Sequence, residues 1–125
     1  MLTTRIVGVI NLLNGAVVQS IRFKEYLPIG KPEVAINYLD SWGADEIILL
    51  NINRQTKSKN SLIRKLLSYS KFCQTPLAVG GGIKSLRDIE LLIRNGADKV
   101  VINTNGHLNP NLFSEGAKEF GEQAM

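Results

Sequence analysis

The sequence contains little of several residue types, and each shortage excludes a class of protein. Its single cysteine, Cys73, allows neither an internal disulfide nor a multi-cysteine metal site, and it fits a reducing compartment. Aromatic residues make up only 6% of the 125 residues, and no apolar run approaches the length of about 18 residues that a membrane span needs. The N-terminus lacks the pattern of a secretory signal peptide. We therefore expect a cytoplasmic protein with neither a metal nor another cofactor.

Positive charge is moderate and scattered along the chain. Fifteen Lys and Arg residues against eleven Asp and Glu residues give a net charge of +4, with a mild basic excess between residues 54 and 71. Nucleic-acid binding would call for a basic helix face with interleaved aromatic residues, and no such face is evident. A solvated surface that attracts anions is the better interpretation. A chain of this length buries about two thirds of its unfolded surface, so we expect a single domain over residues 1–125.

Four short apolar runs rich in β-branched residues alternate with segments of helical periodicity. The runs are Ile6–Ile10, Ile47–Leu50, Pro76–Val79 and Val100–Ile102. Because each run is nearly continuous, it is typical of a strand that is covered on both faces in a parallel sheet. Four helical segments lie between and after the runs, which predicts an α/β fold with right-handed crossovers.

Each expected helix carries its own signals. The first begins near Pro32, with the apolar positions Val34, Ala35, Tyr38, Leu39 and Trp42 at helical spacing. The second carries Leu62, Leu66, Leu67, Tyr69 and Phe72. Ser85, followed by Asp88, is an expected N-cap for the third, and the fourth extends from Asn109 to Phe120.

The chain also contains an internal repeat and one irregular stretch. Residues 43–49 (GADEIIL) occur again as residues 96–102 (GADKVVI), an offset of 53, so a module of two βα units occurs twice. Asn14-Gly15 is a tight-turn signal, which predicts that residues 16–23 form a hairpin with the preceding segment. We expect residues 24–31 to form a mobile loop.

Polar residues and glycines follow the expected strands, where parallel α/β folds bind ligands. Asn11 ends the first strand, Asn51 and Asn53 the second, and Asn103, Thr104 and Asn105 the fourth. The third strand ends in Gly80-Gly81-Gly82, which would let the backbone approach an anion near the N-terminus of the following helix. Alone, the glycine run is equally consistent with a tight turn. With Asn103 and Thr104 on the adjacent strand, it predicts a phosphate site formed by Gly81, Gly82, Asn103 and Thr104.

Charged residues lie at the opposite ends of the strands. Arg5, Glu46 and Lys99 each open a strand, so we expect them around the amino-terminal mouth of the sheet. They could form a surface cluster of little energetic value. They could also form a charged collar around a central opening, but from the residues alone the surface cluster is the better interpretation.

These motifs together resemble a known family. The stretches that carry the likeness are Arg5-Ile6, Asn14-Gly15, Asp45-Glu46 with Leu49-Leu50, Val79 to Ile83, and Gly96 to Val100 leading into Ile102-Asn103-Thr104. The whole chain resembles the N-terminal half of the cyclase subunit of imidazole glycerol phosphate synthase, from histidine biosynthesis. That family is a TIM barrel made of two similar halves, each with one phosphate site.

The resemblance implies roles for individual residues. Gly82, Asn103 and Thr104 would hold the phosphate of this half, and Asn11 and Asn51 would lie at its ligand mouth. Arg5, Glu46 and Lys99 would belong to the charged gate through which ammonia enters from a glutaminase partner. Asp98 would lie on the face that meets that glutaminase. Residues 17–24 also resemble a branch linked to amidotransferases of surface-polysaccharide sugar amidination.

Departures from the family pattern bear on catalysis. The family's first catalytic aspartate is Asn11 here, its second lies beyond Met125, and Asn51 and Gln19 replace a further aspartate and a lysine. An amide has no proton equilibrium near neutral pH, so Asn11 cannot act as a general base. His107 is better interpreted as a bystander. We expect the cyclase reaction to be absent or severely reduced.

Half of a barrel leaves open sheet edges, which invite pairing with another chain. We therefore expect a (βα)4 half of a TIM barrel, completed by a two-fold homodimer or a higher oligomer, with an open flavodoxin-like sheet as the structural alternative. Three functions remain. The chain could bind phosphate or a phosphosugar without turnover. It could be a diverged ammonia-using lyase or transferase with a glutaminase, acting in histidine or amidinated surface-sugar synthesis. It could also be a non-catalytic association module.

Overall fold

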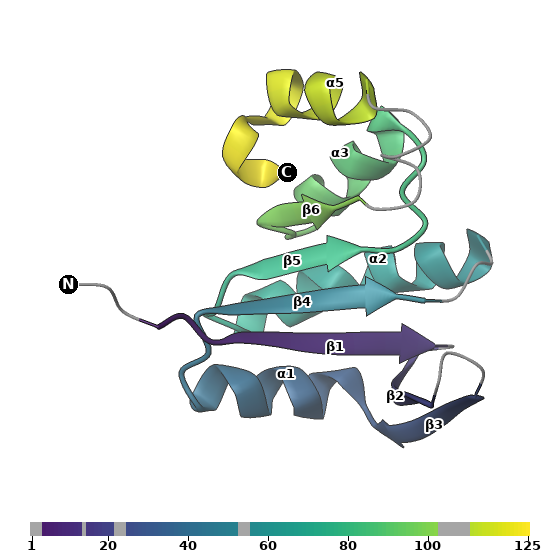
Figure 1. The fold of residues 1–125 in the computed structure, drawn as a ribbon, viewed down its shortest axis with the longest axis vertical. Coiled ribbons are helices and arrows are strands. Elements are labelled where there is room, and N and C mark those ends of the chain that lie inside the picture. The colour runs from purple at the N-terminus through teal and green to yellow at the C-terminus, as the bar shows by residue number, and fades with distance from the viewer. Residues whose placement is uncertain (1–3, 14, 22–24, 53–55, 103–110) are drawn as a thin grey trace.

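The computed structural model describes residues 4–13, 15–21, 25–52, 56–102 and 111–125, and Figure 1 shows their arrangement. Within these residues the strands form one six-stranded sheet, in the order β3-β2-β1-β4-β5-β6. The strands are β1 (Val7–Leu13), β2 (Ala16–Ile21), β3 (Glu25–Gly30), β4 (Glu46–Asn51), β5 (Leu77–Gly80) and β6 (Lys99–Val101). The predicted apolar runs overlap β1, β4, β5 and β6, and each begins within one residue of its strand.

The four strands predicted from the apolar runs pair in parallel and in chain order. β1 pairs with β4, β4 with β5, and β5 with β6. A flavodoxin-like sheet would place its strands in another order, so that alternative is wrong. The consecutive parallel order is that of a TIM barrel.

An antiparallel hairpin extends the sheet beyond β1. Leu12 pairs with Val17 and Leu13 with Ala16, which confirms the predicted hairpin with the preceding segment. The mobile loop predicted for residues 24–31 is wrong, because Glu25–Gly30 form β3 and pair with β2. Pro28 weakens the strand signal there. An edge strand tolerates proline, however, because one of its sides forms no ladder hydrogen bonds.

The helices are α1 (Pro32–Ser41), α2 (Thr56–Phe72), α3 (Leu86–Arg94) and α5 (Asn111–Phe120), followed by the short 3-10 helix η1 (Glu122–Ala124). Pro32 begins α1, and the Ser85 side chain accepts a hydrogen bond from the Asp88 backbone N–H at 3.2 Å, as the sequence predicts. In Figure 1, α1 lies at the β1 end of the sheet, and α3 and α5 lie at the β6 end.

Only one face of the parallel strands is fully covered. The residues that share the buried face are Ile10, Leu12, Ile47, Leu49, Leu77, Val79 and Val100. On the opposite face, Val7 and Val9 are exposed, and Ile48, Leu50 and Val101 are half-buried. The expectation of two covered faces is therefore wrong for this face within the described residues. The strands are nevertheless apolar on both faces.

The face of α1 that packs on the protein differs from the apolar positions picked out by the sequence. Ile36 is fully buried, and Leu39 lies over Gly8 of β1. Val34, Tyr38 and Trp42 are exposed, because they lie on the side of the helix away from Ile36. On α2, Leu62, Leu66 and Tyr69 are buried as predicted, whereas Leu67 and Phe72 are exposed.

Candidate anion site and charged cluster

The pairing register brings the carboxyl ends of neighbouring strands to one level. Asn11 pairs with Leu50, and Leu50 pairs with Gly80. The side chains of Asn11 and Leu50 therefore project from the same, incompletely covered face. Asn51 follows one residue later and is buried, and its register partner Leu12 belongs to the helix-covered face. The two asparagines predicted at the ligand mouth thus share an edge of the sheet but lie on opposite faces.

Gly81 and Gly82, which follow β5, differ in how closely other atoms surround them. Gly81 has φ +106°, and a Cβ there would collide with the backbone of Asn51. Gly82 has φ +71°, and a Cβ there would meet nothing within 4 Å. Both backbone conformations favour glycine. Gly81 therefore fixes the loop against the end of β4, whereas Gly82 is exposed, with open space around its α-carbon.

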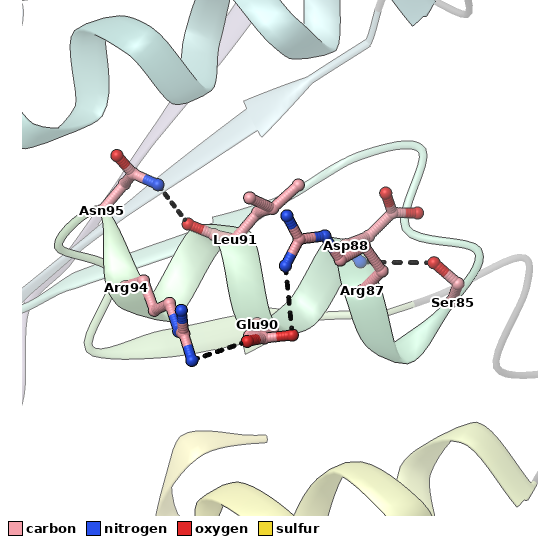
Figure 2. Close-up of polar contacts among 7 residues, drawn as sticks. All are labelled: Ser85, Arg87, Asp88, Glu90, Leu91, Arg94 and Asn95. Carbon is pink, nitrogen blue, oxygen red and sulfur yellow. Dashed lines mark hydrogen bonds and ion pairs between the residues drawn. The ribbon is translucent and has the colours of Figure 1, made fainter.

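The N-terminus of α3 is capped by its own side chains, as Figure 2 shows in part. Ser85 accepts the N–H of Asp88, and the Asp88 carboxylate accepts the N–H of Lys84 at 2.9 Å. Two backbone amides around the N-terminus of α3, where the sequence predicts anion binding, thus already have acceptors within the chain. Glu90 forms ion pairs with Arg87 and Arg94 along the same helix, at 3.4 and 2.9 Å. An anion beside Gly82 would therefore depend on loop donors more than on these two amides.

Several predicted residues cannot be placed. Asn53, Asn103, Thr104, Asn105 and His107 lie outside the described residues. Gln19 lies on β2, opposite Leu27. The structure thus places Gly81 and Gly82 of the four residues predicted to hold phosphate.

The three charged residues predicted at the amino-terminal mouth do come together. Glu46 opens β4 and pairs with Arg5 at 3.7 Å and with Lys99 of β6 at 3.5 Å. The Glu46 side chain is only 11% exposed, whereas those of Arg5 and Lys99 are 60% and 41% exposed. A largely buried carboxylate thus lies between two cations that reach solvent. Their role as a gate stays a prediction.

The repeated Gly-Ala-Asp segments have the same structure at both of their positions. Asp45 Oδ2 accepts the N–H of Ile6 at 2.7 Å, and the Asp45 N–H donates to the Ile6 carbonyl at 2.8 Å. Asp98 makes the same pair of bonds with Leu77, both at 2.8 Å. Each aspartate therefore attaches the start of one strand to its neighbour. Asp45 attaches the segment that carries Arg5, and Asp98 immediately precedes Lys99.

A third carboxylate contact had no signal in the sequence. Asp40 at the end of α1 accepts hydrogen bonds from the Thr75 hydroxyl at 2.6 Å and the Thr75 N–H at 3.0 Å. The Thr75 hydroxyl is the main reason why the pKa of Asp40 lies below its usual value. Cys73 is buried, as predicted, and its thiol contacts the Thr75 carbonyl at 3.4 Å. Burial raises the pKa of that thiol, which disfavours the reactive thiolate.

Two absences hold for the described part of the chain. No three His, Cys, Asp or Glu side chains gather there in a way that could hold a metal ion. No helix found there combines the length and the apolar character needed to cross a membrane.

Comparison with known proteins identifies the family. A family model described as "Histidine biosynthesis protein" matches residues 5–125. The chain belongs to this family. It is 37% identical over its whole length to the imidazole glycerol phosphate synthase subunit HisF of Prochlorococcus marinus, covering 49% of that protein. It is 38% identical to the same subunit of Methanocaldococcus jannaschii and 35% identical to that of Metallosphaera sedula, covering 46% and 50% of them.

Membership in the histidine biosynthesis family confirms the resemblance read from the sequence. It also agrees with the fold, because the family is one of TIM barrels and the four parallel strands follow a TIM-barrel order. The chain spans about half the length of the curated relatives that it matches. The assignment of one domain to residues 1–125 stays a prediction.

Proposed function

We propose that this chain is the phosphate-binding half of a cyclase-type barrel, and that it holds phosphate or a phosphosugar without the cyclase reaction. One observation carries the proposal most strongly. Gly82 presents exposed backbone at the carboxyl end of β5, in a left-handed conformation and with open space where a side chain would lie. Backbone N–H groups in such loops form anion-binding concavities. The family resemblance adds Asn103 and Thr104 as further donors.

Asn11 supports binding rather than turnover. It lies in register with Leu50 and Gly80, in line with the glycine loop, where the family resemblance places a catalytic aspartate. An amide can donate and accept hydrogen bonds there, but it cannot exchange a proton at neutral pH. A ligand could thus be oriented by Asn11 without being converted.

The charged cluster favours a second candidate. Glu46 lies between Arg5 and Lys99 at the amino ends of the strands. In the resembling family, these positions form a gate for ammonia. This arrangement is consistent with a diverged ammonia-using lyase or transferase that works with a glutaminase, in histidine or amidinated surface-sugar synthesis. The third candidate, an association module, requires no ligand.

Titration of the full chain with inorganic phosphate, followed by amide NMR shifts and by calorimetry, tests the proposal. We expect shifts around Gly82, and at least a tenfold weaker affinity in Gly82→Asp, because the added carboxylate occupies and repels the anion. Thr104→Ala should also weaken binding. Gly43→Asp is the matched control, because Gly43 has φ +81°, is exposed and has nothing within 4 Å of a Cβ.

The outcomes separate the candidates. Unchanged affinity in Gly82→Asp would overturn the assigned site. Ammonium-dependent consumption of a phosphosugar by the wild type would favour the ammonia-using enzyme. A chain that binds no phosphate but forms a stable complex with a glutaminase would favour the association module.

A further inference from the structure

A cavity of about 190 Å³ lies at the amino ends of the parallel strands, between the end of α2 and the starts of β5 and β6. The lining residues that bear on its chemistry are Ser70, Cys73, Thr75, Leu77, Gly96 and Asp98. Thr75 and Leu77 are buried, whereas Asp98 is exposed to solvent. At about 30 Å³ for each water molecule, the volume has room for a small organic group. The cavity lies at the opposite end of β5 from Gly82.

The hydroxyl and thiol donors in the cavity walls are already used within the chain. The Ser70 hydroxyl donates to the Leu67 carbonyl at 2.9 Å, and the Cys73 thiol donates to the Thr75 carbonyl at 3.4 Å. The Thr75 hydroxyl donates to Asp40 Oδ1 at 2.6 Å. A hydroxyl whose proton is used in this way has only its lone pairs to offer another partner. The walls therefore present the oxygens of Ser70 and Thr75 as hydrogen-bond acceptors.

Asp98 gives the cavity a negative charge. Its Oδ2 accepts the Leu77 N–H at 2.8 Å, whereas within the described residues its Oδ1 accepts no hydrogen bond. The adjacent Lys99 does not neutralise this carboxylate, because its ammonium group pairs with Glu46 at 3.5 Å. Among the described residues, no lysine or arginine lines the cavity. The C-terminus of α2 adds the negative end of a helix dipole. A cation is therefore the favoured occupant.

We propose that this cavity binds the guanidinium group of a small molecule. A guanidinium spreads its charge and its N–H donors over a plane, so it can reach acceptors on different walls at once. Those acceptors are Asp98 Oδ1, Ser70 Oγ and Thr75 Oγ1. An ammonium group carries its three donors on one nitrogen and is more strongly hydrated, so it loses more on leaving water. This second site does not depend on anion binding at Gly82.

The internal repeat provides a matched control within the same chain. Asp45 makes with Ile6 the same pair of hydrogen bonds that Asp98 makes with Leu77, but Asp45 does not line the cavity. Asparagine at either position keeps an oxygen that can accept the backbone N–H and removes the negative charge. A general effect of lost charge should therefore appear in both variants, whereas loss of a bound cation should appear only in Asp98→Asn.

Titration of the full chain with methylguanidinium chloride at constant ionic strength, followed by amide NMR shifts, tests the proposal. Methylurea is the control ligand, because it has nearly the same shape and no charge. We expect methylguanidinium to shift the amides of Leu77 and Gly96 but not that of Gly82, and methylurea to shift none of them. Asp98→Asn should weaken binding about tenfold, and Ser70→Ala about threefold. Asp45→Asn should bind like the wild type.

Equal shifts with methylurea, or an unchanged affinity in Asp98→Asn, would overturn the site. An equal loss of binding in Asp45→Asn would also overturn it, because the loss would then follow net charge alone. Methylammonium that binds as tightly as methylguanidinium would contradict the choice of a guanidinium. A capped Gly-Arg-Gly peptide that binds when methylguanidinium does not would identify an arginine of another protein as the occupant instead. Phosphate shifts at Gly82 in the same samples bear on the anion site alone.

Discussion

At the scale of single residues, the contact between Asp40 and Thr75 joins two segments that are distant in sequence. Asp40 lies in the last turn of α1, and Thr75 lies just before β5. One carboxylate oxygen of Asp40 accepts both the hydroxyl and the N–H of Thr75. Hydrogen bonds to the ionised form lower a carboxyl pKa, as they do here. The contact should therefore stabilise the fold only while Asp40 is ionised.

Thr75→Val should lower the free energy of unfolding near neutral pH and have a smaller effect in acid. The folded-state pKa of Asp40 lies below its unfolded value, so its contribution is present above about pH 4 and is lost as pH falls through the folded pKa. Urea unfolding from pH 7 down to pH 2 measures the difference between variant and wild type. Thr75→Ser retains the hydroxyl and should behave like the wild type. A difference that stays constant across this range would contradict the proposed linkage.

Single residues also show what the sequence could predict about the site. Ser85 and Asp88 were predictable because an N-cap and its partner are close in sequence and have a specific chemistry. The cluster of Arg5, Glu46 and Lys99 was predictable because parallel strands bring their first residues to one edge. The bonds between Asp40 and Thr75 were not, because no local pattern links residues that meet only after two βα units have packed.

At the scale of elements, the two Gly-Ala-Asp segments explain how neighbouring strands keep their register. Asp45 and Asp98 each exchange two hydrogen bonds with one residue near the start of an adjacent strand. Register in a sheet covered mainly on one face is otherwise set by the apolar pattern alone. Asp45 precedes Glu46 and bonds to Ile6, the residue after Arg5, and Asp98 precedes Lys99. The two aspartates thus hold Arg5 and Lys99 near Glu46.

Replacing either aspartate with alanine should destabilise the protein, and Asp98→Ala should have the larger effect, because Leu77 is buried whereas Ile6 is exposed. We expect Asp98→Ala to cost about 1–3 kcal/mol, because it leaves the N–H of buried Leu77 without its acceptor, and Asp45→Ala to cost less than about 1 kcal/mol, because water can replace the acceptor at exposed Ile6. Hydrogen exchange should accelerate at Ile6 in the first variant and at Leu77 in the second. The asparagine variants retain an acceptor oxygen and should lose less. Fast exchange at both amides in either variant would indicate general loosening of the sheet instead.

The strands and helices themselves were largely predictable, and the exceptions have physical causes. The apolar runs and helical spacing located β1, β4, β5, β6 and the four helices, because each must bury one face. β3 was missed because it is an edge strand that contains Pro28, so its own sequence gives only a weak strand signal. Its pairing with β2 stabilises it as a strand. Val34, Tyr38 and Trp42 on the exposed side of α1 were taken as core, because spacing alone cannot show which of two apolar faces meets the sheet.

At the scale of the whole molecule, the four parallel strands follow one another in the order of a TIM barrel. The chain spans about half the length of the curated relatives that it matches, and one apolar face of its parallel strands is incompletely covered within the described residues. Sequence patterns predicted this architecture because it follows from alternating elements. They could not identify what pairs with the outer edges of β1 and β6, because strand edges of one type can pair with any complementary strand.

The homodimer expected from the sequence would make stability depend on protein concentration, whereas an anion site would not. With such a dimer, the thermal midpoint of the wild type should rise with protein concentration, because each tenfold increase adds about 1.4 kcal/mol per mole of dimer. Adding phosphate should raise the midpoint at every protein concentration, since ligand binding to the folded state stabilises it. A midpoint that is independent of protein concentration would exclude the dimer. A phosphate effect that persists would still support the site at Gly82, because binding there needs only the carboxyl edge of one sheet.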